Sequence, residues 1–183
     1  GKYNSSIDLD GTDDYVEVVD NANLDFGDTN DLIISGWFNR DTFTTDDVIV
    51  AKRNGIANTD QGYILYIDDA TDKLTFEVCD ATVTCDEYQL ESTSTFTATG
   101  WNHFAVVWDQ DSAANSEIYI NGRDDNATDT GTIGNIGDLS NAVVMRLGSE
   151  SDGANYFDGK LDNIQLYRYA ITESNLDIVR RFY

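Results

Sequence analysis

The sequence predicts an all-β protein: a sandwich of two antiparallel sheets with one short helix at the C-terminal end. Apolar residues recur with period two, which places alternate side chains on opposite faces of a strand. Gly, Asn, Asp and Thr interrupt this alternation roughly every ten residues, a spacing typical of sandwiches. The 183 residues, 40% of them hydrophobic, suit one domain with its own core. We therefore expect a single domain over residues 1–183, excised from a larger exported protein.

Each expected strand is an alternating stretch bounded by turn residues. In chain order the ranges are Ser5–Leu9, Tyr15–Val19, Asp31–Arg40, Val48–Lys52, Gly62–Asp68, Lys73–Cys79, Asp86–Glu91, Trp101–Trp108, Glu117–Ile120, Ala142–Leu147 and Lys160–Tyr169. The helix is expected after Thr172, whose side chain can cap it, and Arg180 and Arg181 fall at the negative end of its dipole.

The charge of the chain excludes two classes of partner. Asp and Glu total 34 against 11 Lys and Arg, which gives a formal net charge of −23. Nucleic acids and anionic lipid surfaces recruit clustered Lys and Arg, and the sequence has no such cluster. It also has no apolar run near the ~20 residues of a membrane span and no signal-peptide pattern. We expect neither nucleic-acid binding nor membrane insertion.

The acidic residues are mostly short, because 27 are Asp, and only four of the basic residues are Lys. Dispersed carboxylates keep a surface hydrated where salt screens their repulsion, so this composition is similar to that of halophilic proteins. The alternative is an ordinary acidic secreted domain.

The two cysteines, Cys79 and Cys85, flank a short turn between two expected strands. Hairpin arms on either side would bring them to bridging distance, which favours a disulfide over a pair of reduced thiols. The sequons at Asn4 and Asn126 are also compatible with export, although such short patterns arise by chance. We expect an extracellular location.

Five segments carry a family resemblance through their order and spacing: IDLDGTDDYVEVVDNANLDFGDTNDLIISGWFNRD, IVAKRNGIANTDQGYILYID, WNHFAVVWD, EIYINGRDD and YFDGKLDNIQLYRYAITESNLDIV. They resemble the laminin-G-like, or concanavalin-A-like, lectin domains, in the branch that includes the pentraxins, over nearly the whole chain. The resemblance implies a jelly-roll sandwich, often with a structural calcium ion. This fold carries lectins, adhesion modules, glycan-binding appendages and some glucanases, so it does not by itself select a function.

The sequence argues against catalysis. Retaining glucanases of this fold hold two carboxylates about 5 Å apart on one strand face, in an E-x-D-x-x-E pattern that is absent here. Glu77 and Asp80 fall on opposite faces, and Glu87 and Glu91 share a face but lack the acid between them. The single histidine, His103, is expected in the core or at its rim. We predict a non-catalytic domain.

Calcium is the expected ion, because it takes hard oxygen ligands and the chain is rich in Asp. Strand alternation puts Asp162 on the face of two core residues, and Asp14 precedes an alternating valine pair in the same way. The resemblance implies that the counterpart of Asp162 ligates a structural calcium with oxygens from the end of the first strand and from the loop before the third. The candidate metal ligands are therefore Asp162 and Asp14 and, from the resemblance, Asp10 and Asp28. The alternative is that Asp162 or Asp14 caps a turn.

Two loops combine the aromatic, amide and charged side chains that bind sugars. The candidate ligand-binding residues are Asp46, Asp47, Arg53, Asn54, Asp60, Gln61 and Tyr63 in the first loop region and Asp152, Asn155 and Tyr156 in the second. The alternative is a pair of solvated connections whose tyrosines pack on the sheet edge.

Two functions fit these features. The first is a monomeric, non-catalytic module of an extracellular or cell-surface protein that binds carbohydrate in adhesion. The second is a module that recognises another surface protein and binds no glycan. A glycan-binding module is expected to show an aromatic ring flanked by polar groups in a concave site, whereas a protein-binding module is expected to expose a flatter apolar patch.

Overall fold

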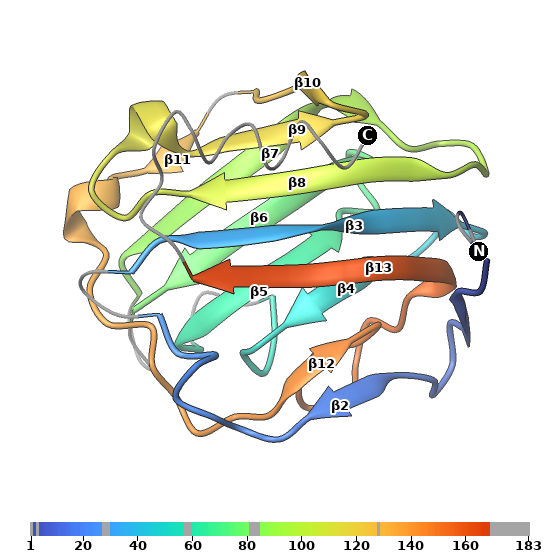
Figure 1. The fold of residues 1–183 in the computed structure, drawn as a ribbon, viewed down its shortest axis with the longest axis horizontal. Helices are drawn as coiled ribbons and strands as arrows, with labels where there is room; N and C mark the ends of the chain where they lie inside the picture. Colours follow the sequence, from blue (N-terminus) through green and yellow to red (C-terminus); the bar gives the residue numbers. More distant parts are fainter. Residues whose placement is uncertain are drawn as a thin grey trace.

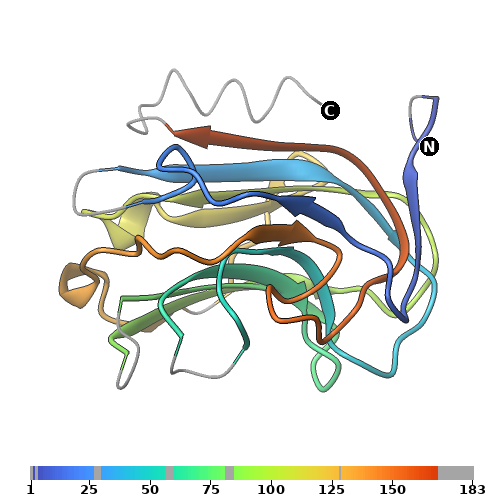
Figure 2. The same cartoon turned by 90° about the horizontal axis from the view of Figure 1, so that it is seen from below.

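The computed structural model describes residues 2, 4–26, 30–56, 60–80, 85–127 and 129–168. Within these ranges the protein is almost entirely β structure, with two antiparallel sheets stacked face to face (Figures 1 and 2). The expected all-β jelly-roll sandwich is confirmed.

Thirteen strands and two single-turn 3₁₀ helices make up the described fold. They are β1 (Ile7–Asp10), β2 (Val16–Val18), β3 (Leu32–Arg40), β4 (Asp47–Ala51), β5 (Gly62–Ile67), β6 (Lys73–Cys79), β7 (Glu87–Thr95), β8 (Asn102–Trp108), η1 (Ala113–Asn115), β9 (Glu117–Ile120), β10 (Arg123–Asp124), β11 (Thr130–Gly131), η2 (Ile133–Asn135), β12 (Met145–Leu147) and β13 (Asp158–Arg168). Each expected strand is present. The two-residue strands β10 and β11 were not expected, because two residues are too few to show a period. The predicted C-terminal helix lies outside the described residues.

One sheet has six strands in the order β1-β13-β3-β8-β9-β10, and the other has seven in the order β11-β7-β6-β5-β4-β12-β2. In Figure 1, β13, β3 and β8 lie in front of β4, β5 and β6. The core fills the space between the two layers. Ile34, Phe38 and Phe104 from the six-stranded sheet and Leu65 and Phe76 from the seven-stranded sheet are fully buried there. Burial of such alternate side chains is the force that holds the layers together.

A β-bulge changes the direction of one predicted site residue. The register of β13 against β3 shifts between Asp162 and Gln165, and Asn163 between them has φ +52°. Asp162 pairs with Trp37, whereas the adjacent Leu161 pairs with Phe38 in the core. Because a bulge interrupts the alternation, Asp162 does not share the inward face that simple period-two counting predicts.

The predicted cysteine pair forms a disulfide at the end of the β6–β7 hairpin. Cys79 and Cys85 are joined, with their Cα atoms 5.3 Å apart. Cys79 is the last residue of β6 and pairs with Glu87, so the bridge closes the hairpin beside its turn.

Candidate functional site

One row of residues crosses the outer face of the seven-stranded sheet from edge to edge. Strand register places them side by side in the order Glu17, Arg146, Ala51, Ile64, Glu77, Gln89 and Thr130. Charged residues therefore lie near the middle and at one edge of this face, and apolar residues lie between them.

Glu77 is the centre of a buried polar cluster on this face. Its carboxylate accepts hydrogen bonds from the Tyr66 hydroxyl at 2.6 Å and the Gln89 amide at 3.1 Å, and it pairs with Arg53 at 2.7 Å. Burial, followed by the nearby Glu77 charge, raises the pKa of Tyr66. Arg53 also donates 2.6 Å hydrogen bonds to the carbonyls of Gly55 and Ile56. This fully buried arginine holds the loop on the sheet and is not presented to a ligand, unlike the sequence prediction.

Glu150 joins the two loops that the sequence predicts as ligand-binding. One oxygen of its carboxylate accepts hydrogen bonds from the Ile56 backbone N–H at 3.0 Å and from the Asn155 side chain at 2.8 Å. The backbone N–H of Ser151 donates to the Arg53 carbonyl at 3.3 Å. Burial raises the pKa of Glu150 despite these bonds. The two loops therefore meet through a residue that the sequence analysis did not select.

Arg146 organises the exposed part of this region. Its guanidinium lies 4.0 Å from the centre of the Tyr15 ring and donates to Glu17 at 3.2 and 3.3 Å. The Tyr156 hydroxyl and the Arg146 guanidinium both lie next to Gly153. A Cβ at Gly153 would be 3.0 Å from the Tyr156 hydroxyl and 3.3 Å from Arg146. We call Tyr15, Glu17, Arg146 and Tyr156 the arginine–tyrosine surface. Tyr15 is 41% exposed within it.

Sequence reasoning found only Tyr156 among these four residues. A signal for the other three was available, because Tyr15 and Glu17 alternate with valines in Tyr15–Val19 and Arg146 is the one polar residue of Ala142–Leu147. The pairing of these two strands, which brings the residues together, is not visible in the sequence.

Two other predicted ligand residues are structural. Asp47 is fully buried, forms an ion pair with Arg40 and accepts a hydrogen bond from the Asp158 backbone. Tyr63 lies in the core, where its hydroxyl donates to the Leu24 carbonyl at 3.2 Å. Both side chains are buried, which composition could not indicate because it does not distinguish buried polar side chains from exposed ones.

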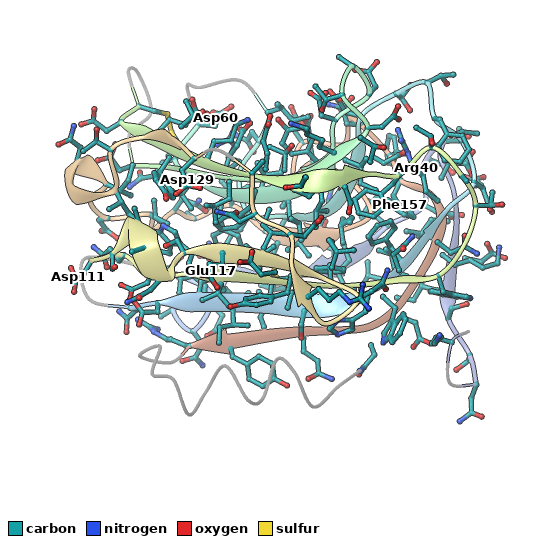
Figure 3. The ribbon with its side chains drawn as sticks, turned by 90° about the horizontal axis from the view of Figure 1, so that it is seen from above. Arg40, Asp60, Asp111, Glu117, Asp129 and Phe157 are labelled. Atoms are coloured by element: carbon teal, nitrogen blue, oxygen red, sulfur yellow. A yellow bond between two sulfur atoms is a disulfide. The ribbon has the colours of Figure 1, made fainter. Side chains whose placement is uncertain are left out.

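The remaining predicted ligand residues are dispersed. Asp46 accepts from the Asp69 backbone at 2.9 Å, and burial raises its pKa. Gln61 donates to the Asp138 carbonyl at 2.6 Å. Asn54 and Asp152 are exposed and Asp60 is half-buried. Figure 3 places Asp60 away from Arg40, the partner of Asp47, along the molecule. The first predicted loop region therefore does not form one site.

The end of β1 forms an acidic hollow of about 410 Å³, lined by Asp8, Leu9, Asp10, Asp14, Asp41 and Asp158. Carboxylate oxygens of Asp10, Asp13 and Asp14 lie within 4.8 Å of one another. Asp10 pairs with Asp158 across β1 and β13. Lys160 offers a positive charge beside the hollow, to Asp8 at 2.8 Å and Asp41 at 3.5 Å. Carboxylates outnumber this cation, so the hollow favours an added cation.

A glycine allows this turn to close. Gly11 has φ +71°, a conformation that other residues rarely adopt. A Cβ at this position would lie 2.7 Å from the Cβ of Asp158. The Asp10 side chain also accepts a hydrogen bond from the Thr12 backbone at 2.9 Å, which fixes the turn.

The structure brings Asp10 and Asp14 together but not with Asp162. Asp162 lines a different hollow, with Ser5 and Ser6, four residues along β13 from Asp158. Four residues of a strand span about 13 Å, which is too far for shared ligation. Asp28 lies outside the described residues. Asp158, which sequence reasoning did not select, occupies the place expected for Asp162.

His103 lies among aromatic residues. It is buried, its ring packs edge-on against Trp37 at 5.1 Å between centroids, and burial lowers its pKa. This position agrees with the expected core or rim histidine.

A known family matches most of the chain. Residues 10–177 match the family described as the concanavalin A-like lectin/glucanases superfamily. No curated protein sequence matches. Among the described residues, no helix has the length and apolar character needed to cross a membrane.

Several solved structures share the fold. The binding domain of Paraclostridial Mosquitocidal Protein 1 is 19% identical with a TM-score of 0.68, over 97% of this chain and 43% of that chain. The CBM40 module of the Ruminococcus gnavus IT-sialidase is 14% identical with a TM-score of 0.58, over 91% and 96%. It has also been solved bound to alpha2,6 sialyllactose.

An SAP-like pentraxin from Limulus polyphemus is 15% identical with a TM-score of 0.55, over 94% of this chain and 83% of that chain. The chain spans less than half of the length of the mosquitocidal binding domain. At these identities the similarities establish the fold alone.

Proposed function

Because the chain belongs to the concanavalin A-like lectin/glucanases superfamily, we propose that it is a non-catalytic carbohydrate-binding module that serves adhesion in an extracellular or cell-surface protein. A carbohydrate-binding module with the same fold, solved with a bound sialylated sugar, supports a role in glycan binding. The disulfide supports an oxidising location.

The arginine–tyrosine surface is the observation that carries this proposal. Sugars stack on exposed aromatic rings and form hydrogen bonds to the charged and polar groups beside them. Tyr15 is 41% exposed and Arg146 stacks on it. Arg146 is itself held by Glu17, so the charged group beside the ring is fixed before a ligand arrives. Tyr156 adds a second hydroxyl at the same place.

The state of Glu77 supports a non-catalytic role. A retaining glycosidase needs two carboxylates about 5 Å apart, one to attack the sugar and one to donate a proton. Both oxygens of Glu77 already accept hydrogen bonds from buried protein groups, namely Tyr66, Gln89 and Arg53. A carboxylate so engaged is a structural element of the sheet face.

We also propose that the acidic hollow holds a structural calcium ion. The donors fit, because Asp10, Asp13 and Asp14 present carboxylate oxygens within 4.8 Å of one another and calcium takes oxygen ligands at flexible geometry. A bound calcium supplies positive charge that neutralises these carboxylates. The turn leads directly into Tyr15, so fixing residues 10–14 also fixes the start of the arginine–tyrosine surface.

A glycan-array screen tests the carbohydrate proposal. The tagged domain is screened in high salt with calcium, and again with chelator, beside Tyr15→Ala and the matched control Ile7→Ala, which truncates another exposed apolar residue. We expect binding to one sugar class that Tyr15→Ala weakens roughly tenfold and Ile7→Ala leaves unchanged. No glycan binding by a protein that still melts cooperatively would contradict the proposal and favour a protein partner.

A further inference from the structure

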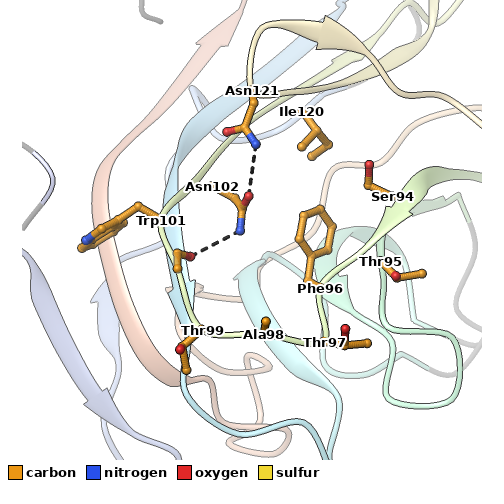
Figure 4. A pocket seen from close by; sticks show the side chains of 11 residues that line it. Ser94, Thr95, Phe96, Thr97, Ala98, Thr99, Trp101, Asn102, Ile120 and Asn121 are labelled. Atoms are coloured by element: carbon orange, nitrogen blue, oxygen red, sulfur yellow. Dashed lines mark hydrogen bonds between the residues drawn. The ribbon is translucent and has the colours of Figure 1, made fainter.

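We propose that a cleft at one end of the sandwich is a separate binding site for a neutral saccharide. The cleft has a volume of about 360 Å³ and lies where residues 96–101 pass from β7 of one sheet to β8 of the other (Figure 4). This volume is within the range of small-ligand sites. The cleft shares no lining residue with the arginine–tyrosine surface or the acidic hollow.

The charge of the cleft sets the class of ligand. None of the described residues that line it is charged, although charged residues make up 25% of the chain. A charged ligand would find no counter-ion here, and an anion would also be repelled by the net charge of −23. The cleft therefore suits a ligand that is polar but neutral.

Two asparagine side chains are fixed in the cleft by one another. The Asn121 carboxamide accepts from the His103 backbone at 3.0 Å and donates to Asn102 at 3.1 Å. Asn102 in turn donates to the Gly100 carbonyl at 3.3 Å. Each NH₂ group has two hydrogens, and each of these side-chain bonds uses one. The asparagines are thus oriented in advance, with further hydrogen-bonding capacity for a ligand.

The remaining lining provides an apolar wall and a hydroxyl rim. Figure 4 shows the Phe96 ring and the Ile120 side chain across from the two asparagines, with Thr97 beside Ala98 on the connection between the two strands. Phe96 and Ile120 are buried, whereas Thr97 is exposed. A pyranose has the matching character, because its C–H groups are apolar and its hydroxyls both donate and accept.

The backbone of the cleft argues against an extended peptide. Strand addition needs main-chain donors that are not already used. The N–H groups of Ser94, Phe96 and Gly100 donate within the protein, to Asp125 at 3.0 Å, to the Asp72 carbonyl at 2.8 Å and to Asn39 at 2.6 Å. These three donors are therefore not open to strand addition, which favours recognition by side chains.

A titration of the ¹⁵N-labelled protein with methyl glucoside, methyl galactoside and methyl mannoside tests this site. We expect saturable shifts of the Thr97, Ala98 and Asn102 amides with at least one of them. Ala98→Trp, at an exposed lining position, should fill the cleft and weaken this binding at least tenfold. The control Ile7→Ala truncates an exposed side chain outside the cleft and should leave this binding unchanged.

The following results would each contradict the proposed binding site in the cleft. No shift up to ~50 mM pyranoside, where a small ligand of ordinary efficiency would bind, overturns it. Shifts confined to Tyr15 and Arg146 overturn it while supporting the proposed glycan function, and tighter binding of sialyllactose in the cleft overturns its neutral character. If Ala98→Trp does not melt like the wild type, Asn102→Asp provides the test instead. This variant keeps the shape of the side chain and removes its amide donor. Unweakened binding by that variant overturns the site.

Discussion

Arg40 and Asp47 form a buried ion pair that joins the two sheets at one end of the sandwich. Arg40 ends β3 in the six-stranded sheet and Asp47 begins β4 in the seven-stranded sheet. The guanidinium also donates to Asp72 at 2.8 Å and to the Thr45 carbonyl at 3.1 Å. Burial raises the pKa of Asp47 to about 6, and the attraction of Arg40 only partly opposes this.

The pKa of Asp47 predicts a pH-dependent contribution to stability. Its folded value of about 6 exceeds the ordinary value of 3.8, so its contribution is complete below pH 4 and declines as pH rises to about 6. At 1.36 kcal/mol per pKa unit, the decline is at most about 3 kcal/mol. Chemical denaturation of the wild type and Asp47→Asn from pH 4 to 7 should show the wild type losing stability relative to the variant. A difference that stays constant, or grows in the opposite direction, would contradict this prediction.

The fold could be predicted because many residues report it together. Apolar and polar residues alternate through β6, and β3 and β5 are long, mostly apolar stretches. Misreading one residue would change neither pattern. The cysteine pair was also predictable, because Cys79 and Cys85 flank a hairpin turn whose two arms both alternate. Such local patterns do not depend on which strands become neighbours.

The candidate site was less predictable because it depends on single residues and on strand neighbours. A bulge at Asn163 redirects Asp162. The sequence does not show where a bulge interrupts the alternation of a strand, so counting residues placed Asp162 on the wrong face. Tyr15 immediately precedes β2, and Arg146 lies in β12. No local pattern reveals the pairing of these two strands. Arg53 is polar in sequence but buried in the fold.

Calcium should stabilise the protein through Asp13. Calcium at about one hundred times its dissociation constant would add about 2.7 kcal/mol to the free energy of unfolding. Asp13→Asn should remove most of this gain because it removes one of three clustered carboxylates. Thermal melts with calcium and with chelator measure the effect, and Asp162→Asn, which lies in a different hollow, is the matched control. If Asp162→Asn loses the response and Asp13→Asn keeps it, the ion belongs at Asp162.

The disulfide should be complete in the native protein. Intact mass after alkylation without reductant should show no free thiol at Cys79 or Cys85. Replacing both residues by Ser should lower the free energy of unfolding by about 2 kcal/mol, because the bridge closes a short loop. Denaturant titration measures this loss. Alkylation of both cysteines before reduction would refute the bridge.

Arg146 should be a positioning residue for glycan binding. Arg146→Gln removes the stacking on Tyr15 and the ion pair to Glu17, so the ring loses its fixed orientation. We expect roughly tenfold weaker binding of any sugar that the array identifies. Lys73→Gln is a suitable control, because it breaks an ion pair with Glu91 on the same sheet. Equal loss in both variants would indicate a general effect of charge.

Glu77 and Arg53 should contribute to stability rather than to binding. Glu77→Gln leaves the buried Arg53 guanidinium without its countercharge, which should cost about 3–5 kcal/mol. Arg53→Met leaves Glu77 uncompensated in the same way, so the double variant should be destabilised by less than the sum of the two, with a coupling above ~1 kcal/mol. Denaturant titration of the four proteins measures the coupling. At temperatures where the variants remain folded, glycan affinity should be unchanged, because neither side chain reaches solvent. Additive losses of stability, or a loss of affinity in folded Arg53→Met, would instead return Arg53 to the ligand site that the sequence predicts.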